Sequence, residues 1–228
     1  ILGQLYFAMG DTYWEKCKKQ MLQTVLQNPD SVPARAAFID MLLRRGSTKD
    51  FPMATTQLTK FREIAPNDIR NVQYTVEIAS KTGKQEDARK YLAQLLPDLK
   101  NPGALTDEQL SIAEFVAGML AKIGDYDAAE RIFRVVTERN PRKALALGEF
   151  LGTHRNVDEG MAILTQNFSP EAAEPVARTA LAVIRARRDE IGDKYDAQVQ
   201  QWLDRALLEN PDSIPLLMLQ AEFDDSRK

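Results

Sequence analysis

Residues 124–141 read GDYDAAERIFRVVTERNP and contain the full pattern of a helix bounded by two breakers. Gly124 permits the positive φ that ends one helix and turns the chain into the next. Ala129 has no bulk, so a second helix can approach closely there, and Phe133 fills the space beside that contact. Pro141 cannot continue a helix, and its fixed φ suits the start of the following one. The stretch predicts a helix packed tightly against a neighbour.

The residues before this stretch predict that neighbour. Ala113, Val116, Ala117 and Leu120 follow the spacing i, i+3, i+4 and i+7, which places them on one face of a helix. The two segments together predict a helix, a short turn and a second helix.

Prolines divide the rest of the chain at similar intervals of 29 to 44 residues. They are Pro29, Pro66, Pro97, Pro141, Pro170 and Pro211. Between successive prolines lie two apolar segments of helical period, usually separated by a glycine. These dividers are Gly10, Gly46, Gly83, Gly124 and Gly192. Strand-like alternation is scarce and no Asn-Gly or Asp-Gly hairpin signal occurs, so the chain is predicted to be all-α and repetitive.

Six helix pairs and a terminal helix near residues 213–223 are predicted, all in a single domain. The expected units are approximately 1–29, 30–66, 67–97, 98–141, 142–170 and 171–211, with the terminal helix in 212–224. Cys17 takes the position of Ala129 in the first unit, because each lies twelve residues before a proline. In the fifth unit Arg155-Asn156 stands where a glycine is expected, and Asn tolerates the left-handed conformation nearly as well.

The stretch from Gly124 to Pro141 resembles the tetratricopeptide repeat in its glycine turn, aromatic Tyr126, small Ala129, aromatic Phe133 and terminal proline. A weaker likeness covers nearly the whole chain. The resemblance implies a right-handed α-α superhelix, a solenoid of about six helix pairs plus a terminal helix. A HEAT-like array stays open because the spacing is irregular, whereas the threonine-proline turn of ankyrin repeats is absent.

Composition limits the classes of function. The 228 residues include 30 Lys and Arg against 33 Asp and Glu, a formal net charge of −3, which does not demand nucleic acid or an anionic membrane as partner. One cysteine and one histidine exclude an intrachain disulfide and a paired-histidine or multi-cysteine metal site. No apolar run approaches the ~18 residues of a membrane span. We therefore predict no metal, no cofactor and no membrane span.

Cys17 and His154 are the only candidates for a thiol nucleophile and its imidazole base. They lie four units apart, in an array where each unit contacts only its neighbours, so direct contact is not expected. We expect Cys17 to be a small packing residue and His154 a solvated or capping side chain at a helix end. No glycine-rich phosphate loop or GxSxG elbow occurs. The chain is predicted to contain no catalytic residues and not to be an enzyme.

The sixth unit contains two charged clusters. The acidic residues near its turn are Asp189, Glu190, Asp193 and Asp196, and their spacing does not follow a calcium loop. We interpret them as ordinary partners of helix dipoles. Arg178 and Arg185 share a helix face and could hold a carboxylate or phosphate, although solvated charges near a helix C-terminus are the alternative.

In the tetratricopeptide family the first helices of successive units line a concave groove in which peptides or helices dock. Carried over unit by unit, the resemblance implies a partner-binding groove containing Arg70, Gln73, Tyr74, Glu77, Lys81, Glu114, Phe115, Lys122, Arg178 and Arg185. Periodicity alone shows only that these positions avoid the internal apolar stripe. The lysine and asparagine clamp of domains that bind chaperone tails is not recovered.

The leading hypothesis is a protein-interaction scaffold that binds a peptide or protein segment in this groove without catalysis. An RNA-binding helical repeat is the second hypothesis, but it should show a basic groove, and this chain is slightly acidic. A regulatory or targeting module of a larger enzyme or export assembly is the third. The residues do not identify the partner.

The chain begins and ends inside apolar periodic segments, which predicts a piece of a longer protein. No signal peptide is visible, and the low cysteine content favours the cytoplasm but also fits the periplasm if an upstream targeting segment was removed. Leu216, Leu217, Leu219 and Phe223 offer more apolar surface than one buried stripe uses. This helix is expected either to pack on the sixth unit and leave an apolar outer face, through which the isolated chain could self-associate, or to be the first half of a seventh unit.

Overall fold

The computed structural model describes residue 7, residues 11–45 and residues 47–227. Twelve α-helices and three short 3-10 helices form in these residues, and no strand does. Helix makes up 79% of the structure, which confirms the all-α prediction. The predicted glycine turns at Gly10 and Gly46 lie outside the described residues.

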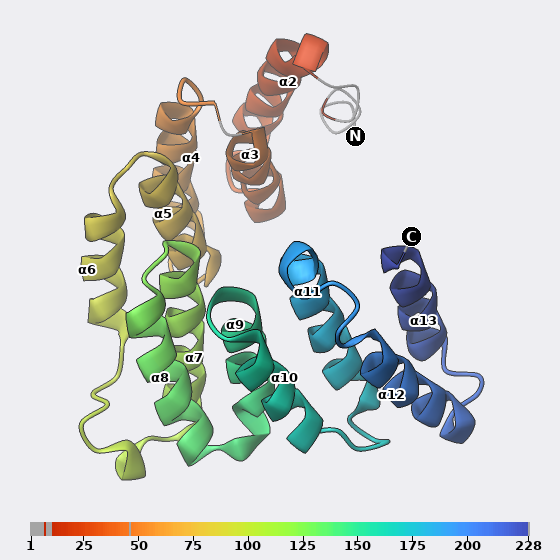
Figure 1. Cartoon of the computed structure of the whole chain (residues 1–228). Coiled ribbons are helices and arrows are strands. Elements are labelled where there is room, and N and C mark those ends of the chain that lie inside the picture. The colour runs from red at the N-terminus through yellow and green to blue at the C-terminus, as the bar shows by residue number, and fades with distance from the viewer. Residues whose placement is uncertain (1–6, 8–10, 46, 228) are drawn as a thin grey trace. The chain divides into compact units, whose positions relative to one another are not determined.

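The chain divides into two compact units, Ile1–Gln94 and Leu95–Lys228. The first contains η1 (Asp11–Tyr13), α2 (Trp14–Gln27), α3 (Val32–Arg45), α4 (Phe51–Ile64), α5 (Arg70–Lys81) and nearly all of α6 (Gln85–Leu95). The second contains η2 (Pro102–Ala104), α7 (Asp107–Lys122), α8 (Tyr126–Arg139), η3 (Pro141–Lys143), α9 (Ala144–His154), α10 (Val157–Gln166), α11 (Ala173–Ile191), α12 (Asp196–Glu209) and α13 (Ile214–Ser226) (Figure 1). The prediction of a single domain stays a prediction.

The helices follow the proline punctuation. Each predicted unit from 30–66 to 171–211 contains two helices, and α13 occupies the place of the predicted terminal helix. The last helix runs to Ser226, three residues beyond the predicted end.

Glycine turns separate the two helices of three units. Gly83, Gly124 and Gly192 have φ of 73°, 81° and 53°, as the sequence predicts. The expectation for the fifth unit is wrong: no described residue other than glycine has a positive φ. Asn156 has φ −109° and caps α10 instead, its Oδ1 accepting a hydrogen bond from the Glu159 amide at 3.0 Å. An N-cap residue needs extended backbone, so the left-handed conformation does not arise there.

Small residues recur at the fourth position of the second helix in successive units. Cys17, Ala54, Ala88 and Ala129 hold this position in α2, α4, α6 and α8, and each is at most 1% exposed. Gly160 takes it in α10 and is also buried. A small side chain at a fixed point lets a neighbouring helix approach closely. The sixth unit departs from this pattern, because α12 has the buried Val199 at the same position.

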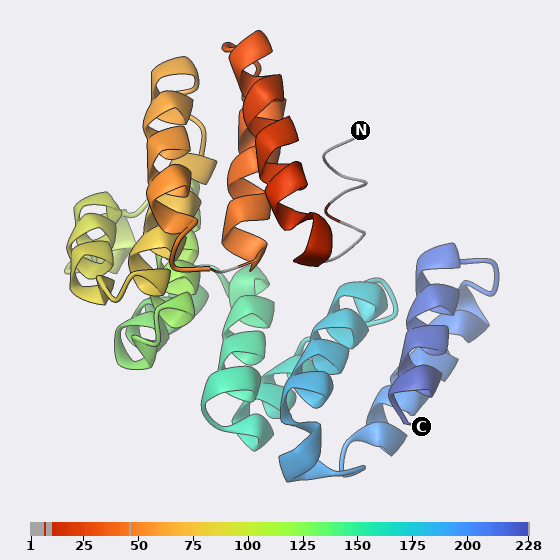
Figure 2. The same ribbon diagram turned by 90° about the horizontal axis from the view of Figure 1, so that it is seen from above.

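The core of the first unit lies between α2, α3, α4 and α5. Phe38 of α3 and Phe61 of α4 are buried there, and Figure 2 shows α2, α3 and α4 alongside one another. The buried carboxylate of Asp50, at the start of α4, accepts hydrogen bonds from Trp14 Nε1 at 3.1 Å and Lys18 Nζ at 2.8 Å. These bonds satisfy a charge that would otherwise be costly to bury, and they tie α2 to α4.

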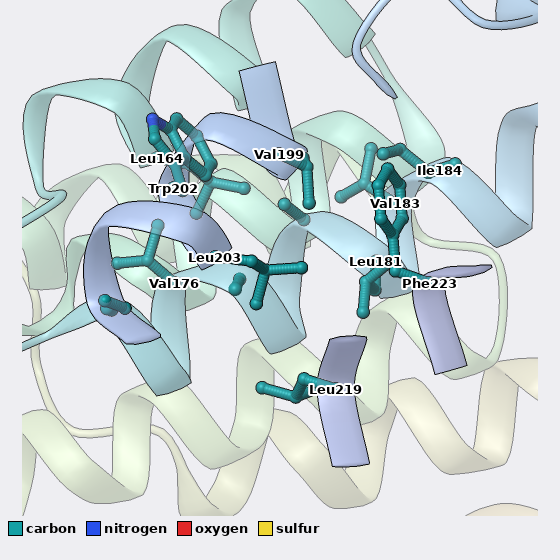
Figure 3. Packing of buried hydrophobic residues seen from close by; sticks show 14 of the residues in the cluster. Leu164, Val176, Leu181, Val183, Ile184, Val199, Trp202, Leu203, Leu219 and Phe223 are labelled. Carbon is teal, nitrogen blue, oxygen red and sulfur yellow. The ribbon is translucent and has the colours of Figure 1, made fainter. Parts of the chain in front are cut away.

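One core of the second unit joins α10, α11, α12 and α13. Leu181 and Ile184 of α11, Leu203 of α12, and Leu219 and Phe223 of α13 are all buried in it (Figure 3). The terminal helix is thus an integral part of this core.

Ala129→Leu is expected to lower the free energy of unfolding by roughly 1–3 kcal/mol, because added bulk overpacks a fully buried contact. The same change at Ala128, which is half-buried, should cost much less. Urea denaturation followed by circular dichroism measures both. Equal losses would show that the repeat register is misassigned.

Candidate functional site

An open hollow of about 400 Å³ lies between α7 and α9, the first helices of the fourth and fifth units. It is lined by Gly118, Ala121 and Lys122 of α7, by Tyr126 and Phe133 of α8, and by Ala146, Glu149, Phe150, Thr153 and His154 of α9. Because all ten residues belong to three consecutive helices of the second compact unit, the hollow is a local feature of that unit.

The space exists because small residues occupy the facing sides of α7 and α9. Gly118, Ala121 and Ala146 have little or no side chain to fill it. A Cβ atom added at Gly118 would meet no heavy atom within 4 Å, which confirms that the space beside this glycine is empty.

Aromatic rings form the floor. The ring centroids of Phe133 and Phe150 lie 5.1 Å apart, and both side chains are buried. The rings of Tyr126 and His154 are stacked, with centroids 4.8 Å apart and planes 19° apart. The Phe150 and His154 centroids lie 5.7 Å apart. The four rings form one cluster, which lines the hollow with an aromatic surface.

The imidazole of His154, exposed at the end of α9, belongs to this cluster. Burial lowers the pKa of His154, and the nearby positive charge of Arg187 lowers this pKa further. Arg187 is held in place by the Thr153 carbonyl, which accepts its Nη1 at 3.1 Å, and by an ion pair with Glu190. A neutral ring stacks on Tyr126 without the cost of desolvating a charge.

Two opposite charges stand on the walls. Lys122 near the end of α7 and Glu149 in the middle of α9 are both exposed. Within the described residues neither forms an ion pair, whereas Glu114, two helical turns before the end of α7, pairs with Lys143. The hollow therefore combines an apolar floor with one exposed cation and one exposed anion.

The predicted groove residues of the first unit all lie on α5, and one of them is misassigned. Tyr74 is only 4% exposed, its hydroxyl donates to the Ala36 carbonyl at 3.4 Å, and its ring packs edge-on against Phe61. Burial, together with a hydrogen bond to Asp40, raises the pKa of Tyr74. Tyr74 is a core residue because α5 packs on α3 and α4, and it cannot contact a partner in this structure.

The other α5 residues of the predicted groove have different surroundings. Arg70 pairs with Asp68 at 2.6 Å and lies over the ring of Phe61. Gln73 is half-buried, and Glu77 and Lys81 are exposed.

Of the ten predicted groove residues, Lys122 alone lines the hollow. Glu114 forms an ion pair with Lys143, and Phe115 is half-buried. Arg178 pairs with Glu174 at 2.7 Å and Arg185 with Glu222 at 3.2 Å. The arginines proposed to hold an anion therefore already have carboxylate partners within the chain.

Sequence reasoning missed the α9 side of the hollow because the predicted groove was not extended to the fifth unit. Leu147, Gly148 and Leu151 form the internal stripe of α9, which leaves Glu149 and Thr153 on another face. On the other first helices, groove residues were those that lie off the internal apolar stripe. The same rule applied to α9 identifies Glu149 and Thr153. No pattern in the sequence predicts the stacking of His154 on Tyr126, because this contact depends on the angle at which α8 crosses α9.

No family model matches the chain, and no curated protein matches it significantly. The likeness to tetratricopeptide repeats rests on the residues of the chain itself.

Other classes of site find no support in the described residues. These residues contain no group of three or more His, Cys, Asp or Glu side chains placed to hold a metal ion. Cys17 is fully buried, and burial raises the pKa of its thiol, so the prediction of a packing residue is confirmed. Among the described helices, none combines the length and apolarity that crossing a bilayer requires.

Proposed function

We propose that this protein is an interaction scaffold, a tetratricopeptide-like right-handed superhelix that binds a segment of another protein and performs no catalysis of its own. The stacking of first helices supports the proposal. Within the compact units, α3 packs on α5, α9 on α11 and α11 on α13, each the first helix of its unit or the terminal helix. Helical repeat arrays build a continuous binding face in this way.

The observation that carries the proposal is the hollow between α7 and α9. Its volume of about 400 Å³ is within the range of ligand pockets, and its floor consists of aromatic rings. Such a site fits one large apolar side chain of a partner. The free charges of Lys122 and Glu149 would then select the residues beside it, an acidic group near Lys122 and a donor near Glu149.

The charges favour a peptide over RNA. A groove for single-stranded nucleic acid combines clustered free cations with aromatic rings on which bases stack. Here the aromatic floor is accompanied by one cation and one anion, and Arg178 and Arg185 are engaged by carboxylates. The same peptide-binding site is compatible with a regulatory or targeting module of a larger assembly.

We also propose that the chain self-associates through α13. Leu217 is 48% exposed on this helix, and Ile214 and Met218 are 70% and 59% exposed. Three large apolar side chains exposed on one short helix indicate a contact surface.

Selection of random peptides displayed on phage tests the scaffold proposal. Binders should be enriched in a large apolar residue next to an acidic one. Ala146→Trp, which fills the hollow, should weaken these peptides at least about tenfold, equivalent to about 1.4 kcal/mol, in fluorescence titrations. Lys122→Glu should selectively weaken peptides with the acidic neighbour.

Ala162→Trp is the matched control, because Ala162 is an exposed alanine on α10 outside the hollow. Peptides should bind this variant as they bind the unchanged chain. Selected peptides that tolerate Ala146→Trp would contradict the assignment of the hollow, and the absence of any enriched peptide would contradict the scaffold proposal.

A further inference from the structure

The hollow between α7 and α9 has one polar end. The last turn of α7 supplies Lys122, the first turn of α8 supplies Tyr126, and the last turn of α9 supplies His154. The Tyr126 and His154 rings stack with centroids 4.8 Å apart, which brings the start of α8 beside the end of α9. Lys122 is separated from Tyr126 only by the turn at Gly124, so it belongs to the same end. We call Lys122, Tyr126 and His154 the polar end of the hollow.

The polar groups of this end have no partner within the chain as described. Among the residues that the structure describes, neither the Tyr126 hydroxyl nor the ring nitrogens of His154 form a hydrogen bond, and Lys122 forms no ion pair. An ammonium, a phenolic hydroxyl and an imidazole can all donate hydrogen bonds, and a carboxylate accepts several at once. A single exposed cation matches the single charge of a carboxylate, whereas a phosphate group carries more. The polar end therefore fits a carboxylate.

The charges around His154 come from the helices packed against α9. Helices α8, α10 and α11 contact α9 near this end, and η3 contacts its opposite end. Their charged side chains near His154 form ion pairs, which are Arg187 with Glu190 of α11, Arg155 with Asp127 and Glu130 of α8, and Asp158 and Glu159 of α10 with Lys194 and Arg134. On α9 itself, Glu149 lies one and a half turns, roughly 7.5 Å, before His154. Lys122 is thus an exposed cation without a paired carboxylate among the described residues.

A carboxylate at the polar end would change the protonation of His154. Partial burial, together with the positive charge of Arg187, lowers the pKa of His154 in the empty hollow. A carboxylate beside the ring favours the protonated form and therefore raises this pKa. The protonated ring is compatible with the stack, because the face of Tyr126 attracts a cation. Binding of a carboxylate and uptake of a proton from water are therefore coupled.

We infer that the hollow receives an acidic side chain of the bound segment at its polar end, held by Lys122 and the Tyr126 hydroxyl, and that His154 takes a proton from water as this group binds. The inference rests on the peptide binding proposed above and adds the residues that recognise the acidic group. It also gives the binding a pH dependence. Because the pKa of His154 is higher in the bound form, affinity rises as the pH falls through the bound-state pKa and levels off below the free-state pKa.

Proton NMR provides the first test. His154 is the only histidine of the chain, so its ring protons can be followed by themselves. The probe is N-acetyl-glutamyl-phenylalanine amide, and its glutaminyl counterpart is the uncharged control, both in a buffer free of carboxylates. The acidic probe should raise the pKa of His154 by about one unit, and the control should leave it unchanged.

Calorimetric titration tests the coupling to affinity. The acidic probe should bind severalfold more tightly at about pH 5.5 than at about pH 8, because one unit of pKa shift corresponds to a tenfold change in affinity. The glutaminyl control should bind equally at both. Repeating the titration in buffers of different ionisation enthalpy measures the proton uptake directly.

Variants separate the roles of the three residues. His154→Gln keeps a donor but cannot titrate, so the acidic probe should bind it equally at both pH values. Lys122→Gln and Tyr126→Phe should each weaken the acidic probe about two- to fivefold, as for an exposed charged contact, and leave the glutaminyl control unchanged. Lys81→Gln is the matched control, because Lys81 is an exposed lysine in the last turn of α5 in the other compact unit, and it should change nothing.

The outcomes distinguish this inference from the function on which it rests. Equal binding of the two probes, with an unchanged pKa of His154, would overturn the inference and leave peptide binding in the hollow intact. A pH dependence that persists in His154→Gln would overturn the role of His154. Binding of both probes that Ala146→Trp does not weaken, or no binding of either, would overturn the site itself and the inference with it.

Discussion

Gly160→Ala is expected to lower the free energy of unfolding of the second compact unit by about 3 kcal/mol or more, at the upper end of the cost of overpacking. A Cβ at this position would lie 2.4 Å from the Gly152 amide nitrogen and 2.6 Å from the Gly148 carbonyl oxygen. These are backbone atoms of α9, so no side chain can rotate to relieve the clash. The two helices would have to separate along their whole contact.

Gly118→Ala is the matched control, because Gly118 also lies inside a helix but has no neighbouring atom within 4 Å of an added Cβ. This variant should gain roughly 0.5–1 kcal/mol from the higher helix propensity of alanine. Urea melts of both variants measure the difference. Similar behaviour of the two would mean that α9 and α10 are not in backbone contact at Gly160.

Phe223→Ala should lower the free energy of unfolding by roughly 3–5 kcal/mol, the usual cost of removing a fully buried aromatic side chain. Phe223 is completely inaccessible to solvent between α11, α12 and α13. Amide hydrogen exchange should also show that α13 loses protection first, because Phe223 is the last large anchor of this helix.

Met218→Ala, on the exposed side of the same helix, should change the stability of the monomer by no more than about 0.5 kcal/mol. Both variants are measured at the same low protein concentration, so that self-association does not contribute. If Phe223→Ala is as mild as Met218→Ala, α13 is not docked on the α11–α12 pair.

The helix pairs could be predicted from the sequence because their punctuation is local. Gly124 and Gly192 end helices in a conformation that only glycine adopts easily, and Pro141 stops a helix whatever surrounds it. The close-packing position could be predicted for the same reason, since Ala129 lies at a fixed distance from Gly124 and Pro141 and small residues take the same place in other units. Each of these residues acts through backbone sterics that do not depend on distant parts of the chain.

The sequence could not predict which side chains face the solvent or a partner, because that depends on tertiary contacts. Tyr74 lies on the face predicted to line a groove, yet α5 packs on α3 and α4 in a way that buries it. His154 is exposed at the end of α9, as the sequence predicts, but the stacking of its ring on Tyr126 depends on how α8 and α9 cross. Asn156 caps a helix where a left-handed turn was expected.

The sequence by itself therefore determined that this protein is all-α, where its helix pairs begin and end, and which small residues allow close packing at α2, α4, α6, α8 and α10. Only the tertiary structure decided that the space between α7 and α9 stays open above an aromatic floor, and that α13 buries one apolar face and exposes the other. The physical reason is the range of the interactions. Turn and capping preferences act within a few residues, whereas a hollow or a free helix face depends on the angle and distance at which separate helices meet.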